Sequence, residues 1–275
     1  EREESLELEV GYDAEDERWN VIIKYSGELS GLESEGIIIT PLLGNYAVVN
    51  LPQNRLEVFS HRSQVEYVEK PKSLFFSVVT GRAVSCVNPV QSDKIQLYGK
   101  GVLIACIDSG VDYAHRDFRK EDGTTRIVSL WDQTIPGNPP EGYRIGTEYT
   151  REEINAALQS TSLAERAKLV PSRDTSGHGT AVLAIAAGNG AESQGVYRGM
   201  APESELLVVK LGVPREGGFP RTTELMQGVD YAVRTAVKLG KPLVINLSFG
   251  NSYGTHSGRS LVEPYLDEAA GVGKT

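Results

Sequence analysis

The sequence predicts an α/β protein, in which a parallel sheet with helices on both faces follows a small α+β domain. Two observations predict this architecture. Beyond Gly101, apolar strands alternate with helices, and this order is typical of parallel sheets covered by helices. Before that point, short strand-like segments surround one helical segment. We therefore expect a first domain at residues 1–80 and a second at 81–275, with an insert at about 126–173.

The predicted elements of the first domain are short. Strand-like sequence covers four segments, namely Trp19 to Tyr25, Gly36 to Leu42, Tyr46 to Asn50 and Val65 to Glu69. A helix is predicted from Gln53 to His61. These elements are sufficient for a small sheet with helices on one face.

The second domain starts its alternation with a fully apolar strand, "GVLIACIDSG", which ends in a turn. Two further strands are predicted in "ELLVVKLG" and "PLVINLSFG". The strands are separated by an apolar helix, "TAVLAIAAG", and by an amphipathic helix from Thr223 to Leu239 that Gly240 follows. Ser260 and Glu263 have the capping-box spacing that predicts a last helix.

The insert from Arg126 to Arg173 interrupts this alternation. Its centre, "WDQTIPGNPPEGYRIG", is rich in turn-forming residues, and Thr150 and Glu153 have capping-box spacing for a short helix. We expect the insert to be a surface excursion.

The composition argues against two classes of partner. Lys and Arg number 28 against 37 Asp and Glu, and the net charge of −9 gives no attraction to nucleic acids or anionic membranes. No apolar run reaches the roughly 20 residues that cross a bilayer. The acidic start "EREESLELEV" lacks the basic and apolar regions of a secretory signal, and the sequence leaves the localisation unknown.

The two cysteines, Cys86 and Cys106, match no metal-binding or redox spacing. Cys106 lies within an apolar strand, where a thiol behaves as a small apolar side chain. We expect two reduced thiols and no metal site at these residues.

Two residues at the ends of predicted elements form a candidate catalytic pair. Asp108 follows the strand "VLIACI", and reactive groups collect at the carboxyl ends of strands in open parallel sheets. His178 stands between Gly177 and Gly179 at the start of the next core helix, whose positive end favours a neutral imidazole. Singly, such an Asp is usually a turn former and such a His a cap. Together they indicate the Asp and His of a nucleophilic triad.

These segments resemble a known family. The stretches "VLIACIDSGVDYAHRDF" and "DTSGHGTAVLAIAAG" resemble the Asp and His signatures of subtilisin-like serine proteases, and "VINLSFG" resembles that family's substrate-binding strand. The three occur in the family's order. The insert further resembles the Csp-type germination proteases of clostridial spore formers.

The resemblance implies a role for each matching residue. Asp108 would orient His178, and His178 would be the general base. Substrate would bind along the backbone of two segments, Ser248, Phe249 and Gly250 on one side and Gly217 and Gly218 on the other. The remaining histidines, His61, His115 and His256, are expected to have no catalytic role.

The first eighty residues resemble the propeptide of the Csp-type germination proteases, a small domain that docks on the protease domain and assists its folding. The segment "KPKSLFF" would lead toward the cleft, and self-cleavage would fall between Phe76 and Val87. The partners implied are a peptide or protein substrate and the chain's own propeptide domain. The resemblance to these germination proteases implies a cytoplasmic or spore-associated localisation.

The chain contains no Gly-Thr-Ser, the sequence that carries the family's nucleophile. The resemblance implies that this serine and the oxyanion-hole asparagine lie beyond Thr275. The stretch Gly250 to Gly254 matches the G-x-S-x-G elbow of α/β-hydrolases. Its context does not fit, because no helix signal follows at once and the order of acid and histidine is wrong.

Three interpretations therefore remain open. The chain is the N-terminal part of an active protease, a serine-less pseudoprotease that acts by binding, or a non-enzymatic α/β binding domain. We favour the first, because a sheet that stopped after "VINLSFG" and one helix would expose an apolar edge and face. No organic cofactor is expected, and calcium is possible but not located.

Overall fold

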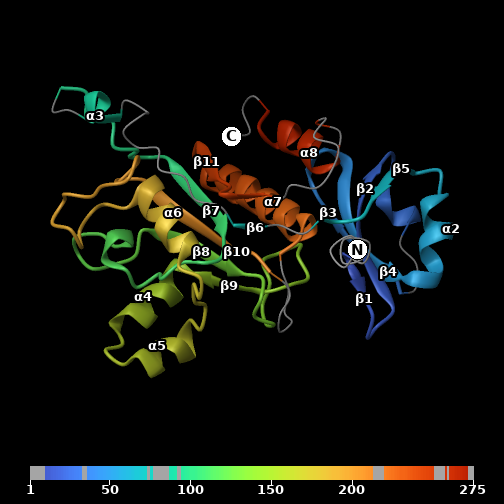
Figure 1. The fold of residues 1–275 in the computed structure, drawn as a ribbon, viewed down its shortest axis with the longest axis horizontal. Helices are drawn as coiled ribbons and strands as arrows, with labels where there is room; N and C mark the ends of the chain where they lie inside the picture. The colour runs from blue at the N-terminus through green and yellow to red at the C-terminus, as the bar shows by residue number, and fades with distance from the viewer. Residues whose placement is uncertain are drawn as a thin grey trace, which may run out of the picture.

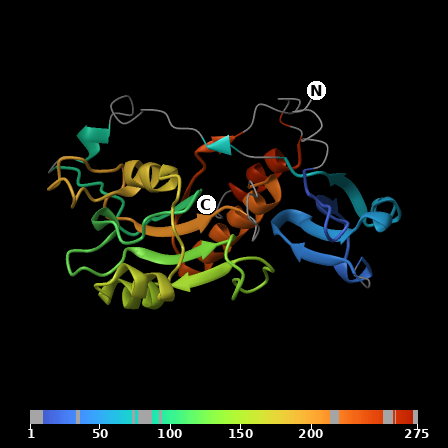
Figure 2. The ribbon, with the colours of Figure 1, turned by 60° about the horizontal axis from the view of Figure 1, so that its bottom comes forward.

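The computed structural model describes residues 10–32, 36–72, 75–76, 87–91, 94–212, 220–250, 258 and 260–271. Two five-stranded sheets are visible in Figure 1, an N-terminal sheet drawn in blue and a second sheet drawn in green to orange. Helices α7 (Thr222–Leu239) and α8 (Val262–Ala269) lie between them, as the turned view in Figure 2 also shows. The contact between the two sheets is therefore made through these helices.

The N-terminal sheet is antiparallel throughout. Its strands are β1 (Tyr12–Asp13), β2 (Arg18–Tyr25), β3 (Ile38–Pro41), β4 (Tyr46–Pro52) and β5 (Val65–Glu69), with β2 paired to β1, β4 and β5. Side chains alternate along β2, so Val21 and Ile23 enter the core of this sheet while Ile22 joins the core beneath α7. This burial on both faces explains the apolar run in β2.

The second sheet has the strand order β11-β7-β10-β8-β9. Its members are β7 (Leu103–Asp108), β8 (Ile127–Asp132), β9 (Thr147–Thr150), β10 (Glu205–Lys210) and β11 (Leu243–Asn246). The first four strands in the spatial order are parallel, and β9 joins the edge antiparallel to β8. The parallel sheet predicted from the sequence is confirmed, with an antiparallel edge strand added.

Helices cover both faces of this sheet, as predicted. One face carries α4 (Arg151–Gln159) and α6 (His178–Ala187), with α5 (Leu163–Leu169) packed on α4, and the other carries α7. Along β7, Ile104 and Cys106 pack toward α6, whereas Ala105 and Ile107 pack toward α7. A strand buried on both faces must be apolar at every position, which is why the sequence of β7 shows no alternation.

Short elements complete the described residues. They are α2 (Leu56–Ser60), α3 (Val87–Val90), β6 (Phe75–Phe76), β12 (Phe249–Gly250) and the 3₁₀ turns η1 (Leu29–Gly31), η2 (Leu43–Asn45), η3 (Gln53–Arg55) and η5 (Arg116–Phe118). The predicted helix at Gln53 to His61 is thus formed by η3 and α2.

The insert is not only a surface excursion, and that expectation is wrong for its first part. Strand β8 is an internal strand that pairs with β10 on one side and β9 on the other. Trp131 on β8 is fully buried, and its indole N–H donates to the carbonyl of Ile145 at 3.0 Å. The sequence did not predict this strand because the turn-forming residues that follow it indicate a loop and outweigh the short apolar segment before them.

The N-terminal sheet packs on α7 and α8 with polar bonds in both directions. The backbone N–H of Leu43 donates to Oδ1 of Asp230 on α7 at 2.9 Å. In return, the backbone N–H of Leu261, at the start of α8, donates to Oε2 of Glu69 at 2.9 Å. The ring of Tyr46 meets that of Tyr265 edge-on, with centroids 5.4 Å apart. Carboxylates from both sides thus receive amide protons across one apolar contact.

A buried arginine ties the loops of the second sheet together. The Arg126 side chain donates to the carbonyl oxygens of Asp117, Ala187 and Ser204 at 2.8–3.0 Å. Ala187 is the last residue of α6, so the guanidinium lies where the helix dipole favours a cation. Burial lowers the pKa of Arg126 to about 10, with Asp117 opposing that effect, and the side chain remains charged at neutral pH.

Replacing Arg126 with Met should destabilise the chain by about 3 kcal/mol, because each buried acceptor left without a donor costs about 1–3 kcal/mol. Urea unfolding of the whole chain measures this loss. Arg55→Met, at an exposed position of the N-terminal sheet domain, is the matched control and should change stability by less than about 0.5 kcal/mol. Equal effects of the two substitutions would contradict the role of Arg126.

Candidate active site

The candidate site lies at the carboxyl end of β7, where two residues seventy positions apart in the sequence meet. Asp108 is the last residue of β7 and is fully buried. His178 is the first residue of α6, which begins after Gly177 in a left-handed conformation with φ of 75°. The Nδ1 atom of His178 lies 2.7 Å from Oδ1 of Asp108. The structure therefore brings the two sequence-predicted residues into direct contact.

Burial determines the electrostatics of Asp108. It raises the pKa of this carboxyl above its ordinary value, while hydrogen bonds from His178 and from the Ser109 N–H oppose the shift. Its Oδ2 atom is buried and has no hydrogen-bond partner within the described part of the chain. The ionised carboxylate is therefore held in a costly environment, in which a donor such as the imidazole is strongly preferred.

The carboxylate also determines what the imidazole can do. An ionised carboxylate only accepts hydrogen bonds, so Nδ1 of His178 carries the proton in their contact. The other nitrogen, Nε2, is then left with a lone pair. The side chain of His178 is 11% exposed, which limits solvent contact without closing the ring off. This arrangement can accept a proton at Nε2 and stabilise the resulting imidazolium.

Glycine is required beside the histidine. A Cβ on Gly179 would overlap the carbonyl oxygen of Gly110 and come within 3.1 Å of Oδ1 of Asp108. The start of α6 consequently lies directly against the end of β7. This close approach explains the glycine after His178 that the sequence shows.

Four further polar residues at the site were not singled out from the sequence. Asp174, Ser109, Ser176 and Thr180 form a hydrogen-bonded cluster around the turn that precedes α6. Ser109 Oγ donates to Asp174 and accepts the Gly179 N–H at 2.9 Å. The signal in the sequence was the density of Ser, Thr and Asp on both sides of the two candidate residues.

The predicted substrate strand forms a backbone pair. Strand β12, at Phe249–Gly250, is antiparallel to β6 at Phe75–Phe76, with Phe249 opposite Phe76 and Gly250 opposite Phe75. Ser248 precedes β12, and its hydroxyl hydrogen-bonds the side chain of Asn246. Residues Phe75 and Phe76, in the segment that follows the N-terminal sheet, thus pair with one edge of β12.

An apolar cavity of about 460 Å³ adjoins Ser248. It runs between α6 and the edge strand β11, where Val244 is 54% exposed and Ile185 is 43% exposed. Within the described part of the sheet, β11 is the edge strand on this side, and apolar side chains line the cavity beside it.

Several predicted residues lie outside the described part of the chain. These are Gly217, Gly218, His256 and the segment 77–86 that was expected to contain the cleavage site. Of the other histidines, His115 accepts the Asp117 N–H at its ring and His61 contacts the Glu57 carbonyl. Both make local backbone contacts of the kind that cap turns and helices.

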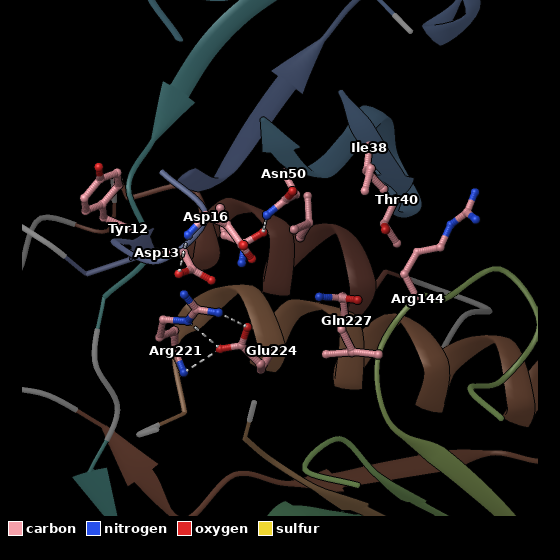
Figure 3. A pocket seen from close by; sticks show the side chains of 13 residues that line it. Tyr12, Asp13, Asp16, Ile38, Thr40, Asn50, Arg144, Arg221, Glu224 and Gln227 are labelled. Atoms are coloured by element: carbon pink, nitrogen blue, oxygen red, sulfur yellow. Dashed lines mark hydrogen bonds and ion pairs between the residues drawn. The ribbon is translucent and has the colours of Figure 1, made fainter. Parts of the chain in front are cut away.

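A separate cavity of about 370 Å³ lies between the N-terminal sheet and α7. Figure 3 shows Arg221, which directly precedes α7, and Glu224 of α7 on one side of it, and Asp13 at the end of β1 and Asp16 in the β1–β2 turn on the other. Arg221 and Glu224 form an ion pair at 2.8 Å. The lining contains neither Asp108 nor His178, so this cavity is distinct from the candidate site.

The described residues contain neither a cluster of metal ligands nor a membrane-spanning helix. In them, no group of three or more His, Cys, Asp or Glu side chains is placed to hold a metal ion, and calcium stays without an assigned site. No helix in the described ranges combines the length and the apolar character that crossing a membrane requires.

Two family models match the chain. Residues 1–72 match the model described as the Csp protease B prodomain, and residues 99–272 match that of the subtilase family. Among curated proteins, a subtilisin-like protease of Solanum lycopersicum is 30% identical over 165 residues, which is 55% of this chain and 20% of that protein. The subtilisin of Bacillus sp. strain TA39 is 28% identical over 154 residues, covering 28% of its own length. The chain thus spans less than a third of these relatives.

The chain is also similar to solved structures of subtilisin-like proteases. The CspB protease of Clostridium perfringens is 33% identical with a TM-score of 0.57, over 66% of this chain and 35% of that one. Fervidolysin from Fervidobacterium pennivorans, a keratinolytic enzyme related to subtilisin, is 14% identical with a TM-score of 0.52 over 91% of this chain and 38% of its own. The second likeness concerns the fold alone.

The raised pKa of Asp108 gives a signed prediction for Asp108→Asn. Ionising this carboxyl costs stability in the folded state, so its contribution is most favourable below the ordinary value of 3.8 and is lost as the pH rises through the raised folded value. The amide variant should therefore be more stable than the parent at pH 7, with the difference disappearing in acid. Thermal unfolding across this pH range measures the effect.

Asp122→Asn serves as the control with the opposite sign. Hydrogen bonds from Thr124 lower the pKa of Asp122, so its contribution to stability is present at neutral pH and is lost as the pH falls. A less stable Asp108→Asn chain at pH 7 would contradict the cost assigned to the buried carboxylate.

Proposed function

The chain belongs to the subtilase family, and from this premise we propose that it is the prodomain and the N-terminal part of the protease domain of a serine endopeptidase. In this proposal Asp108 and His178 are two members of the catalytic triad. The observation that carries it is the 2.7 Å contact between Nδ1 of His178 and the fully buried carboxylate of Asp108. The serine and the oxyanion-hole asparagine would come from a segment beyond Thr275.

The proposed reaction follows from the protonation states of the pair. His178 Nε2 takes the proton of the serine hydroxyl as its oxygen attacks the carbonyl carbon of the scissile peptide bond. Asp108 holds the Nδ1 proton and stabilises the imidazolium while the tetrahedral intermediate exists. The imidazolium then gives its proton to the leaving amine, and an acyl-enzyme remains. Water, deprotonated by the same Nε2, hydrolyses this ester and regenerates the serine.

We propose that peptide substrates bind as the tail of the prodomain does. The antiparallel pairing of β6 with β12 supports this, because an extended peptide added to an open strand edge gains main-chain hydrogen bonds without a sequence requirement. Ser248, Phe249 and Gly250 would form one side of the substrate site, and Gly217 and Gly218 the other. The tail would be cleaved between Phe76 and Val87, just after the paired residues.

The docked prodomain would act as a folding template for the helices that it contacts. Asp230 supports this because its fully buried carboxylate accepts from the Leu43 N–H, from the Tyr143 hydroxyl and from Arg234. One carboxylate thereby joins the N-terminal sheet, the insert and α7. Separating the sheet from α7 would leave that carboxylate without one of its donors.

The catalytic proposal predicts that the natural gene product, with whatever sequence follows Thr275, reacts with a fluorophosphonate probe and loses its N-terminal segment. Intact mass should place the cut between Phe76 and Val87. His178→Ala should abolish both reactions, whereas His115→Ala should preserve them, since that ring makes a local backbone contact. A folded product that neither reacts nor self-cleaves would instead support the alternative, a pseudoprotease that acts by binding.

The docking proposal predicts that Asp230→Ala destabilises the whole chain by about 3 kcal/mol, because the buried Tyr143 hydroxyl and the part-buried Leu43 N–H lose their acceptor. Amide hydrogen exchange should accelerate at Leu43, and urea unfolding measures the stability. Asp267→Ala, at an exposed position of α8, should change stability by less than about 0.5 kcal/mol. Unchanged exchange at Leu43 in Asp230→Ala would contradict the docking role.

A further inference from the structure

Residues Ser172, Arg173 and Asp174 cross the carboxyl edge of the second sheet just before the turn that contains His178. Ser172 Oγ donates to Oδ2 of Asp132, the last residue of β8, at 2.6 Å. The Arg173 carbonyl accepts from Nζ of Lys210, the last residue of β10, at 2.6 Å. These three consecutive residues are thus bound to successive strand ends, since Asp174 in turn bonds to the end of β7.

The bond to β7 is made by Ser109. Its hydroxyl donates to Oδ1 of Asp174 at 2.8 Å and accepts the backbone N–H of Gly179 at 2.9 Å. Because β7, β10 and β8 are neighbours in the sheet, the segment is held at three adjacent points. The strands of a packed sheet form a rigid frame, so the segment from Ser172 to Asp174, which leads into the turn before His178, is held in a fixed position relative to Asp108.

Asp174 is the centre of this arrangement. Its Oδ1 also accepts the Gly177 N–H at 2.9 Å and the Ser176 hydroxyl at 3.2 Å. Its Oδ2 accepts both the N–H and the hydroxyl of Thr180, at 2.8 and 2.7 Å. Burial alone would raise the pKa of this carboxyl, but these hydrogen bonds, led by those of Thr180, outweigh it and hold the pKa below its ordinary value. The ionised carboxylate therefore persists at neutral pH.

The contacts surround His178 on both sides in the sequence. Its own backbone N–H donates to the Ser176 hydroxyl at 3.1 Å, and the next N–H, that of Gly179, donates to Ser109. Thr180 Oγ accepts the N–H of Asp112, which follows β7. The backbone that carries the imidazole is consequently tied to the backbone that carries Asp108 through hydroxyl groups.

We propose that Asp174 is a positioning residue whose contacts with Ser109 and Thr180 set the bond between His178 and Asp108, and with it the direction of Nε2. The inference rests on the proposed role of His178 as the general base. It extends that role to residues that touch neither substrate nor the reacting atoms. A carboxylate that served only to cap the turn would act on the imidazole through its charge alone.

The test measures the hydrogen bonding and the protonation of the His178 imidazole by nuclear magnetic resonance of the whole chain. With four histidines in the sequence, the ring signals are few, and His178→Ala assigns the one of interest. Two observables are followed: the low-field Nδ1–H resonance of a histidine bonded to a carboxylate, and the titration of the ring carbon-bound protons.

The variants are Asp174→Asn, Ser109→Ala and, as the matched control, Asp122→Asn. Asp122 accepts the N–H and hydroxyl of Thr124, the same pattern that Asp174 shows with Thr180, but it lies in an exposed turn. Ser109→Ala removes no charge, so it separates positioning from the loss of a nearby negative charge. Thermal unfolding of each variant confirms that it is folded.

We expect Asp174→Asn and Ser109→Ala to broaden or remove the low-field resonance and to lower the pKa of His178 by about 0.5–1 unit, a three- to tenfold change in its protonation equilibrium. The direction follows because a loosened carboxylate stabilises the imidazolium less. Asp122→Asn should leave both observables unchanged. If Asp174→Asn does not fold, Ser109→Ala carries the test.

A folded Ser109→Ala chain with an unchanged resonance and titration would overturn the proposal, and so would an equal shift in Asp122→Asn. Neither result depends on turnover. A chain that shows the expected shifts but whose natural gene product fails to react with fluorophosphonate would refute the catalytic proposal alone.

Discussion

The contact between Asp108 and His178 is the constraint on which the rest of the site depends. A fully buried carboxylate is unfavourable unless donors reach it, and here those donors are one imidazole and one backbone N–H. To bring the imidazole there, α6 must start against the end of β7, which requires a glycine at 179 and a left-handed residue at 177. The local sequence around His178 is largely the consequence of this approach.

The same chemistry recurs at the contact between the N-terminal sheet and the helices. Asp230 receives an amide proton from the sheet, and Glu69 of the sheet gives an acceptor to the start of α8. Each bond joins a carboxylate to a backbone N–H that lacks a partner in its own element. The edge-on packing of Tyr46 against Tyr265 buries apolar surface between the sheet and α8. The two hydrogen bonds are directional, so they define how the sheet is oriented on the helices.

Local patterns predicted most of the elements. The apolar runs of β2, β7 and β10 predicted strands, and capping-box spacing predicted the start of α4, where the Thr150 N–H donates to Glu153 at 2.8 Å. Asp108 and His178 were identifiable because each stands at the end of such an element. Strand β8 was missed because its sequence, "IVSLWD", is less uniformly apolar than those of β7 and β10 and runs directly into a turn-rich stretch.

The sequence by itself determined most of the elements, the order of Asp108 before His178, and the chemistry of the strand end and the helix start at which these two residues stand. The tertiary structure alone decided that β8 is an internal strand, that Ser172 and Asp174 bind to strand ends, and that Asp230 joins three parts of the chain. The reason is physical. Strand and helix periodicity depends on neighbours within a few residues, whereas a hydrogen bond between Ser109 and Asp174 depends on a distance that exists only once the sheet has formed.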